Sequence, residues 1–406
     1  MKYRHQTGGL IRSVLIFALA ALPAALSDAT EGTYLHGHGP IQRSRTGAGV
    51  ASPRDASWMI LNPAGLVELE RRVDIGLDIA LSDVTLDPGG LIGNPFTGEM
   101  TDSQYFFIPS LGMVWPTERG VAGVGLYVPS GIGDDFPHSR NILSQLFHGN
   151  ADRRLEFQQF RLVWAYGRKF DNGWALGFGV NVSVSRARSD SLTLDLTPTD
   201  GDNEWDYALG AGFNLGVYKK WDRFAFGASY QSRQWSERFH DYEDLLRYPL
   251  DLPHIIQVGV AYDVTPKLEL VLDYKFIHWT SSKLAGKLPT EGGFGWQDQH
   301  IVKFGLEWRI NNAWTFRAGY SHGNSPLVEE HVFINGLPST SVIERHLGFG
   351  VSYAFGEHSE VHLTFVRAFD RELTGKPGGD ILSWLGAGTK AGLGHDGVTL
   401  GYTYRF

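Results

Sequence analysis

The chain has 406 residues, a formal net charge of −8 and no cysteine, which excludes a disulfide scaffold. Its charges are spread along the chain, which argues against the basic patch of a nucleic-acid-binding protein. The 50 glycines, 24 phenylalanines, 16 tyrosines and 12 tryptophans favour many strands joined by tight turns, and a closed hydrogen-bonded sheet would hold such a chain together without disulfides.

Residues 1–29 have the features of a secretory signal peptide. Basic residues precede an apolar run over 14–26, and residues 27–29 offer a small-x-small cleavage pattern. The alternative is a transmembrane anchor, but the run is shorter than the roughly 20 residues that span a bilayer. No later segment is apolar enough for a membrane helix, so a membrane location would require a β-barrel. We therefore expect a protein exported to the outer membrane of a Gram-negative cell.

Residues 30–71 lack the alternation of a strand and are rich in glycine and small residues. The pattern predicts a short helix over 56–61, because Asn62 precedes Pro63 and a residue before proline is pushed out of the helical region. About forty residues are too few to fold alone. We expect this segment to form a plug, or hatch, in the lumen of a barrel; a disordered leader is the alternative.

From residue 72 to 406, apolar residues alternate with small or polar ones, as in a sheet with two different faces. Large apolar residues opposite charged ones suit lipid outside and a wet lumen inside, although a soluble sandwich also alternates. Short turns alternate with long connections along the chain, which favours the barrel, with the long loops outside the cell. The expected fold is all-β, a fourteen-stranded antiparallel transmembrane β-barrel, with strands at 72–82, 104–115, 120–130, 154–170, 173–187, 205–219, 223–235, 254–264, 267–278, 299–310, 313–322, 343–355, 359–370 and 396–406.

Two of the long connections carry apolar stripes. Residues 236–248 are predicted to hold an amphipathic helix, and residues 131–153 carry a second stripe. Exposed apolar patches on outer loops suggest capture of a hydrophobic ligand, whereas packing of loop against loop is an equal alternative. The candidate capture residues are Leu143, Leu146, Phe147, Phe239, Tyr242 and Leu246.

The segment before the barrel carries the most specific signal. Gly37-His38-Gly39-Pro40 is followed by Gly47-Ala48-Gly49, Asp55-Ala56 and Asn62-Pro63-Ala64-Gly65. This series resembles the N-terminal hatch of the FadL family of outer-membrane transporters for long-chain fatty acids and hydrocarbons. The resemblance covers essentially the whole mature chain, and within it Asn62, Pro63, Ala64 and Gly65 form the hatch motif.

The resemblance implies ligand capture at the outer loops, binding in the lumen near the hatch and lateral exit at a kinked third strand. Gly123, Gly125 and Pro129 are the residues expected to permit that kink, unless the glycines only make room for the hatch. A fatty acid would gain from a lumenal cation. Candidate head-group cations are Arg161, Lys303 and Arg317, each of which would otherwise pair with a lumenal acid.

We therefore expect a passive channel for hydrophobic compounds, with long-chain fatty acids as the first expectation and aromatic or aliphatic hydrocarbons as the alternative. A barrel lipase needs a serine near a histidine on the outside of the wall, and Ser352 has no assignable histidine; a porin without a hatch is disfavoured by the motif. No catalytic or cofactor motif is present, and His36 with His38 is weak evidence for a metal. No enzyme activity, cofactor, metal or nucleic acid is expected. The expected partners of this monomer are the transported compound, outer-membrane lipid and lipopolysaccharide.

Overall fold

The computed structural model describes residues 31–87, 99–136, 153–190, 200–201, 203–335 and 340–406. The expected signal peptide (1–29) and the candidate capture residues Leu143, Leu146 and Phe147 lie outside the described residues. Among the described residues, none of the helices combines the length and the apolar character needed to cross a membrane.

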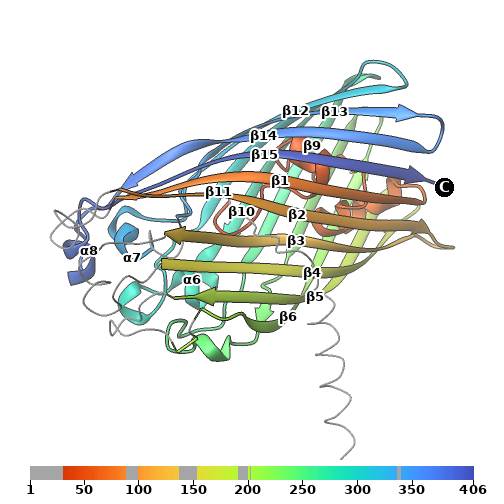
Figure 1. Cartoon of the computed structure of the whole chain (residues 1–406). Coiled ribbons are helices and arrows are strands. Elements are labelled where there is room, and N and C mark those ends of the chain that lie inside the picture. Colours follow the sequence, from red (N-terminus) through yellow and green to blue (C-terminus); the bar gives the residue numbers. More distant parts are fainter. Residues whose placement is uncertain (1–30, 88–98, 137–152, 191–199, 202, 336–339) are drawn as a thin grey trace, which may run out of the picture.

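The strands form one closed antiparallel barrel (Figure 1), in which β1 pairs with β15 and every other wall strand pairs with its neighbours. The short β8 pairs with β6 and continues the wall strand begun by β7, so fourteen wall strands surround the lumen, as the sequence predicts. The strands are β1 (Arg72–Asp87), β2 (Met100–Pro116), β3 (Val121–Phe136), β4 (Arg153–Lys169), β5 (Trp174–Ser189), β6 (Asp206–Lys220), β7 (Phe224–Gln231), β8 (Trp235–Ser236), β9 (His254–Thr265), β10 (Leu268–His278), β11 (Gln299–Arg309), β12 (Trp314–Gly323), β13 (Arg345–Phe355), β14 (Ser359–Thr374) and β15 (Lys390–Arg405).

Alternate residues of each strand face opposite sides of the wall. In β15, Val398 and Leu400 are 39% and 51% exposed, whereas Thr399 and Thr403 are each 1% exposed. A soluble sandwich would bury the apolar set, so this inverted distribution matches a wall with lipid outside and polar groups inside. The alternation that predicted the strands therefore also predicted which face meets lipid.

The short helices fall into two groups (Figure 1). Three belong to the N-terminal segment, and the others lie in the long connections at one rim, here called the long-connection rim; the opposite rim carries the short turns. The first group is α2 (Gly39–Ser44), α3 (Trp58–Leu61) and η1 (Pro63–Glu68); the second is η2 (His240–Tyr242), η3 (Trp279–Ser281), α6 (Lys283–Gly286), η4 (Pro289–Glu291), η5 (Glu329–His331), α7 (Val332–Asn335) and α8 (Ile381–Leu385).

The helix predicted over 236–248 is wrong, because only the single turn η2 forms there. Side-chain contacts hold this connection in an irregular path instead. The Tyr242 hydroxyl donates to the Glu204 carbonyl at 2.6 Å and accepts from the Ser189 amide at 3.0 Å. Such side-chain to backbone bonds give the chain an alternative to the helical ladder.

The hatch segment, defined as Glu31–Glu70, packs inside the barrel against inward-facing glycines. A Cβ atom added at Gly177 or Gly216 would clash with the backbone or side chains of the hatch residues Asn62 to Ala64. The lack of a side chain at these wall positions therefore allows backbone-to-wall contact. The many glycines on the lumenal faces of the strands make room for this segment.

Candidate functional site

The hatch segment begins with a buried charge cluster. The Glu31 carboxylate lies 2.5 Å from Nζ of Lys275 in β10 and also pairs with Nζ of Lys303 in β11. Burial alone would raise the pKa of Glu31, but the two ammonium groups outweigh burial and lower this pKa to about 2. Glu31 is therefore ionised at neutral pH and ties the hatch segment to two strands.

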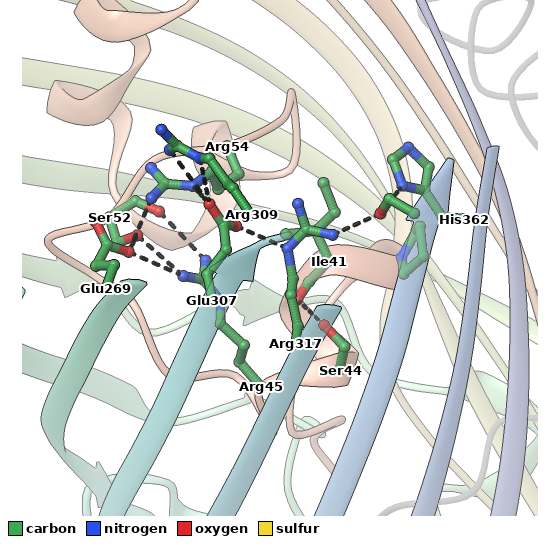
Figure 2. Close-up of polar contacts among 12 residues, drawn as sticks. Ile41, Ser44, Arg45, Ser52, Arg54, Glu269, Glu307, Arg309, Arg317 and His362 are labelled. Atoms are coloured by element: carbon green, nitrogen blue, oxygen red, sulfur yellow. Dashed lines mark hydrogen bonds and ion pairs between the residues drawn. The ribbon is translucent and has the colours of Figure 1, made fainter. Parts of the chain in front are cut away.

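Arginines of the hatch segment pair with acids of the wall. Arg43 lies 2.6 Å from Asp78 of β1. Arg54 bridges two strands, because its terminal nitrogen lies 2.8 Å from Glu269 of β10 and its Nε lies 2.8 Å from Glu307 of β11. Figure 2 shows the further side chains that converge on these two glutamates: Arg45, Ser52, Arg309 and Arg317.

The motif Asn62-Pro63-Ala64-Gly65 forms a further contact with the wall. The Asn62 amide donates to the carbonyl of Val50 at 2.9 Å and to that of Val217, in β6, at 3.2 Å. Its side-chain oxygen accepts from the Ala64 amide at 3.2 Å, and Pro63 begins η1. One buried side chain thus joins two parts of the hatch segment to a strand.

Two of the three candidate head-group cations already pair with acids of the protein. Besides its pair with Glu31, Lys303 donates to two hatch carbonyls at 3.2 and 2.8 Å. Arg317 donates from Nε to Glu307 at 2.7 Å and from a terminal nitrogen to Ser352 at 2.5 Å. Both cations therefore pair with buried acids of the protein, which is the alternative to head-group binding that the sequence left open.

Arg161, the third candidate, is different. It is 1% exposed on the lumenal face of β4, beside the Tyr34 hydroxyl. Its guanidinium donates to the Gln159 side chain at 2.7 Å. Within the described ranges, no carboxylate lies at ion-pair distance from it.

An apolar chamber lies between the hatch segment and the long-connection rim. Its space, part of which is open to solvent, is about 510 Å³, and its lining includes Thr33 of the hatch segment. The Trp279 and Trp296 rings meet edge to face, with centroids 4.8 Å apart. Its aromatic and large aliphatic lining includes Phe157, Leu246, Trp279, Leu284, Phe294 and Trp296.

The described capture candidates pack into this part of the molecule. Leu246 lines the chamber, and Phe239 meets Phe157 edge to face at 6.5 Å between centroids. Phe239 and Tyr242 are 2% and 1% exposed, so neither forms an open patch on the outer surface. Leu246 therefore belongs to the wall of the chamber, and Phe239 and Tyr242 belong to the same buried apolar cluster.

The wall is incompletely hydrogen-bonded between β2 and β3. Their ladder runs only from Pro116–Val121 to Leu111–Leu126, although both strands continue toward the long-connection rim. A pocket of about 250 Å³ lies at this opening in the ladder and is lined by Leu35, His38, Ile108, Pro109, Tyr127 and Val128, among others. Beyond it, the Asp135 amide donates to the Asp102 carboxylate at 2.8 Å.

The irregularity of β3 lies at Pro129 and not at the two glycines. The register with β4 shifts between Tyr127 and Ser130, as a β-bulge does. Gly123 and Gly125 lie below the shift, in the regular ladder with β2. Gly123 leaves room for the Met59 side chain and Gly125 for the Tyr127 ring, and a part of these glycines in a bend stays a prediction.

The hatch segment takes the place of β2 beside the bulge. The Leu35 amide donates to the Pro129 carbonyl at 3.1 Å, and the Gly131 amide donates to the Thr33 carbonyl at 3.0 Å. Residues 33–35 therefore satisfy the backbone groups that β3 leaves unpaired. The same three residues border the chamber at Thr33 and the wall pocket at Leu35.

The structure shows the surroundings of Ser352 and of the histidines His36 and His38, which the sequence suggested as possible catalytic or metal-binding groups. Ser352 does have a histidine neighbour, since its hydroxyl lies 2.7 Å from Nδ1 of His362, but both side chains are buried on the lumenal side. The ring centres of His36 and His346 lie 5.1 Å apart and His38 lies near Tyr127, so the two hatch histidines have separate neighbours. No group of three or more potential metal ligands occurs within the described part of the chain.

Sequence reasoning missed the chamber tryptophans and Pro109. A proline inside the predicted strand 104–115 was a usable signal, because proline lacks the amide that a ladder needs. Trp296 lies in a long connection, where no alternation marks which side chains turn inward. Its role depends on contact with Trp279, which the chain order does not predict.

Comparisons with known proteins agree with this architecture. The crystal structure of the Pseudomonas putida toluene transporter TodX matches with a TM-score of 0.68 and 17% identity, covering 92% of this chain and 99% of that one. A Pseudomonas aeruginosa FadL homologue matches with a TM-score of 0.69 and 16% identity over 92% and 100% of the two chains. The Ralstonia pickettii toluene transporter TbuX matches with a TM-score of 0.65 and 18% identity over 92% and 99%.

At such identities these structures establish the fold alone. No curated protein matches the sequence significantly. The family model described as "Outer membrane protein transport protein (OMPP1/FadL/TodX)" matches residues 39–406, which is most of the chain. The protein therefore belongs to the OMPP1/FadL/TodX family of outer-membrane transport proteins.

Proposed function

We propose that this chain admits neutral hydrocarbons, which enter the apolar chamber from the cell exterior and leave sideways through the wall between β2 and β3. Its family transports hydrophobic compounds across the outer membrane, and the substrate within that class is our proposal. The proposed orientation places the long-connection rim outside the cell. The observation that carries the proposal is the composition of the chamber.

The chamber lining suits a molecule without charge. Among the described residues, no lysine or arginine lines it, and the one charged side chain there is Asp251. A fatty-acid carboxylate would lose its hydration in this chamber and meet an acid of the same sign. A hydrocarbon has no charge to desolvate, and its binding is favoured by about 25 cal/mol for each Å² of apolar surface removed from water.

The hatch segment favours a sideways exit. Its charge pairs with β1, β10 and β11 are buried, and breaking one buried pair costs about 3–5 kcal/mol. Movement of the whole segment would break several of them. A ligand released into water also loses about 0.8 kcal/mol for each CH₂ group. Exit into lipid through the pocket beside Ile108 and Val128 avoids both costs.

Toluene is the compound transported by two of the similar proteins, and this agrees with the proposal without deciding it. A second candidate rests on Arg161. A buried guanidinium whose described partners include no carboxylate could hold a fatty-acid head group while the tail occupies the chamber. Long-chain fatty acids, our first expectation from the sequence, therefore remain the competing substrate.

Binding to the purified, folded barrel distinguishes these two substrates. We expect toluene and ethylbenzene to bind wild type and Arg161→Gln equally, and a long-chain fatty acid to bind no more tightly than a neutral alkane of equal length. Arg168→Gln is the matched control, because Arg168 lies on the same strand with its side chain against Phe170. Tighter fatty-acid binding that is lost only in Arg161→Gln would favour the second candidate.

The chamber itself is tested by placing a charge in it. Leu284→Asp should abolish hydrocarbon binding, because Leu284 lines the chamber and is 2% exposed. Leu288→Asp lies in the same connection at a side chain that is 50% exposed and should leave binding unchanged. Equal binding by both folded variants would mean that the hydrocarbon binds elsewhere.

A further inference from the structure

The lipid-facing side of the barrel carries a row of basic side chains at the long-connection rim. Four consecutive strands, β9 to β12, each place one histidine at an outward position near this rim, and β13 adds an arginine. None of these side chains contributes to the chamber or to the wall pocket. The row, here called the rim row, is His254, His278, His300, His322 and Arg345.

The strand register places these residues at neighbouring positions. His254 pairs directly with His278, and His322 pairs directly with Arg345. His300 pairs with Phe276, two residues from His278, and His322 pairs with Val302, two residues from His300. Both offsets run toward the short-turn rim, as expected where tilted strands cross one level of a barrel. The five side chains therefore follow one level around the wall.

The rim row borders the apolar lipid-facing band. On the side toward the short-turn rim, the next outward residues of the same strands are large and apolar, for example Ile256, Val302 and Tyr320, which are 41%, 53% and 41% exposed. A basic group at this boundary meets the lipid headgroups rather than the acyl chains. Beyond the row, Arg367 of β14 pairs with Asp396 of β15, and Asp83 of β1 lies further along the same rim.

Tyrosines orient two of the imidazoles. The Tyr274 hydroxyl lies 2.6 Å from Nδ1 of His300, and the Tyr230 hydroxyl lies 2.6 Å from Nδ1 of His254. The Arg233 amide also donates to Nδ1 of His254, at 3.2 Å. An Nδ1 atom that accepts a hydrogen bond leaves the proton on Nε2, so this histidine keeps a donor for a ligand.

Two further members of the row have neighbours of their own. His278 lies 3.8 Å from Asp298, whose carboxylate also accepts from Thr280. Arg345 lies with its guanidinium 5.5 Å from the centre of the Phe369 ring, an arrangement that holds the side chain along the wall. Imidazole and guanidinium donors in a line, at the level of lipid headgroups, suit a ligand with several anionic oxygens.

We propose that the rim row binds the phosphate groups of a phosphorylated glycolipid in the outer leaflet. Two phosphates carried on one saccharide headgroup can contact several strands at once, whereas a glycerophospholipid presents a single phosphate diester. This glycolipid would form a fixed lipid collar around β9 to β13. The proposal uses the orientation in which the long-connection rim faces outward, but not the identity of the transported compound.

The test measures lipid binding to the intact barrel by native mass spectrometry. The probe is a bisphosphorylated lipid A, compared with the same lipid after phosphatase treatment and with phosphatidylglycerol. We expect lipid A to bind and each comparison lipid to bind roughly tenfold more weakly. Equal binding of the dephosphorylated lipid would overturn the role of the phosphates, and equal binding of phosphatidylglycerol would overturn the choice of a glycolipid.

A matched pair of variants locates the site. His322→Gln with Arg345→Gln removes two paired members of the rim row and should weaken lipid A binding about tenfold. The control, His358→Gln with Arg71→Gln, removes a histidine and an arginine stacked 4.6 Å from the Phe406 ring at the short-turn rim. A second rim variant, His278→Gln with His300→Gln, should reproduce the loss. Unchanged binding in both folded rim variants, or an equal loss in the control, would overturn the proposal.

Discussion

Glu31, the first described residue, pairs with Lys303 of β11 across 272 residues of sequence. Lys275 of β10 shares the same carboxylate at 2.5 Å. Two strands and the start of the hatch segment therefore meet at one buried acid. The contact joins the element that fills the lumen to the wall that encloses it.

Replacement of this acid tests how firmly the hatch segment is held. Glu31→Gln leaves two buried lysines without their carboxylate, and we expect it to cost about 3–5 kcal/mol in the local stability of the segment. Hydrogen exchange of the amides of residues 31–35 should report this loss. Glu68→Gln removes a pair with Lys169 that is partly exposed, and it should change stability by less than about 1 kcal/mol. Equal protection in the two variants would contradict the anchoring role.

Asp55 should contribute more to the stability of the hatch segment at pH 5 than at pH 7. Burial and the nearby Asp74 carboxylate raise the pKa of Asp55 from 3.8 to about 6. A raised carboxyl pKa in the folded state means that stability is greatest below the unfolded value and is lost as pH rises through about 6. The contribution of Asp55 should grow by about 1–2 kcal/mol when the pH is lowered from 7 to 5.

Glu31 does not interfere, because its lowered pKa makes its contribution fall only between pH 4.5 and about 2. The buried His36 and His38 act in the opposite direction, because burial lowers their pKa values and acidification then costs stability. Protection factors for the amides of α3, corrected for intrinsic exchange, give the measurement. The two histidines contribute equally to wild type and to Asp55→Asn, so the difference in protection between these two proteins should grow in favour of wild type as the pH falls from 7 to 5. A profile in Asp55→Asn as steep as in wild type would assign the effect to another group.

A covalent link across the wall pocket tests the sideways exit. Ile108 and Val128 belong to one packed cluster on either side of the opening, and the chain has no cysteine of its own. Ile108→Cys with Val128→Cys, once oxidised, should reduce hydrocarbon uptake into liposomes while leaving binding to the detergent-solubilised barrel intact. Reduction of the bond provides the control within the same molecule. Full uptake by the verified disulfide form would favour a route through the hatch segment.

The Asn62 side chain should contribute to the stability of the hatch segment through its hydrogen bonds. Asn62→Ala removes the side-chain amide that donates to the carbonyls of Val50 and Val217, so both acceptors lose this donor. We expect a loss of about 1–3 kcal/mol in the stability of the hatch segment. Asn172→Ala, in an exposed turn where the side chain accepts from the Trp174 amide at 3.2 Å, is the comparison. Protease cleavage within residues 49–62 should rise only in the first variant.

The sequence by itself determined the wall. Residues such as Val398 and Thr399 alternate with period two, and this local pattern sets which side chain faces lipid and which faces the lumen. The turn residues and the alternating lengths of the connections then set the strand count and the two rims. The hatch motif around Asn62 was readable too, because it is contiguous in the chain.

Only the tertiary structure decided which groups the candidate cations pair with, where β3 bends and where the apolar chamber lies. Whether Lys303 is free for a ligand depends on Glu31, and the position of the bend in β3 depends on how residues 33–35 satisfy its backbone. The apolar chamber depends on rings such as Trp279 and Trp296, which come from a connection without periodicity. These are pairings between distant segments, and local pattern carries no information about them because their free energy arises only when the barrel closes around the hatch segment.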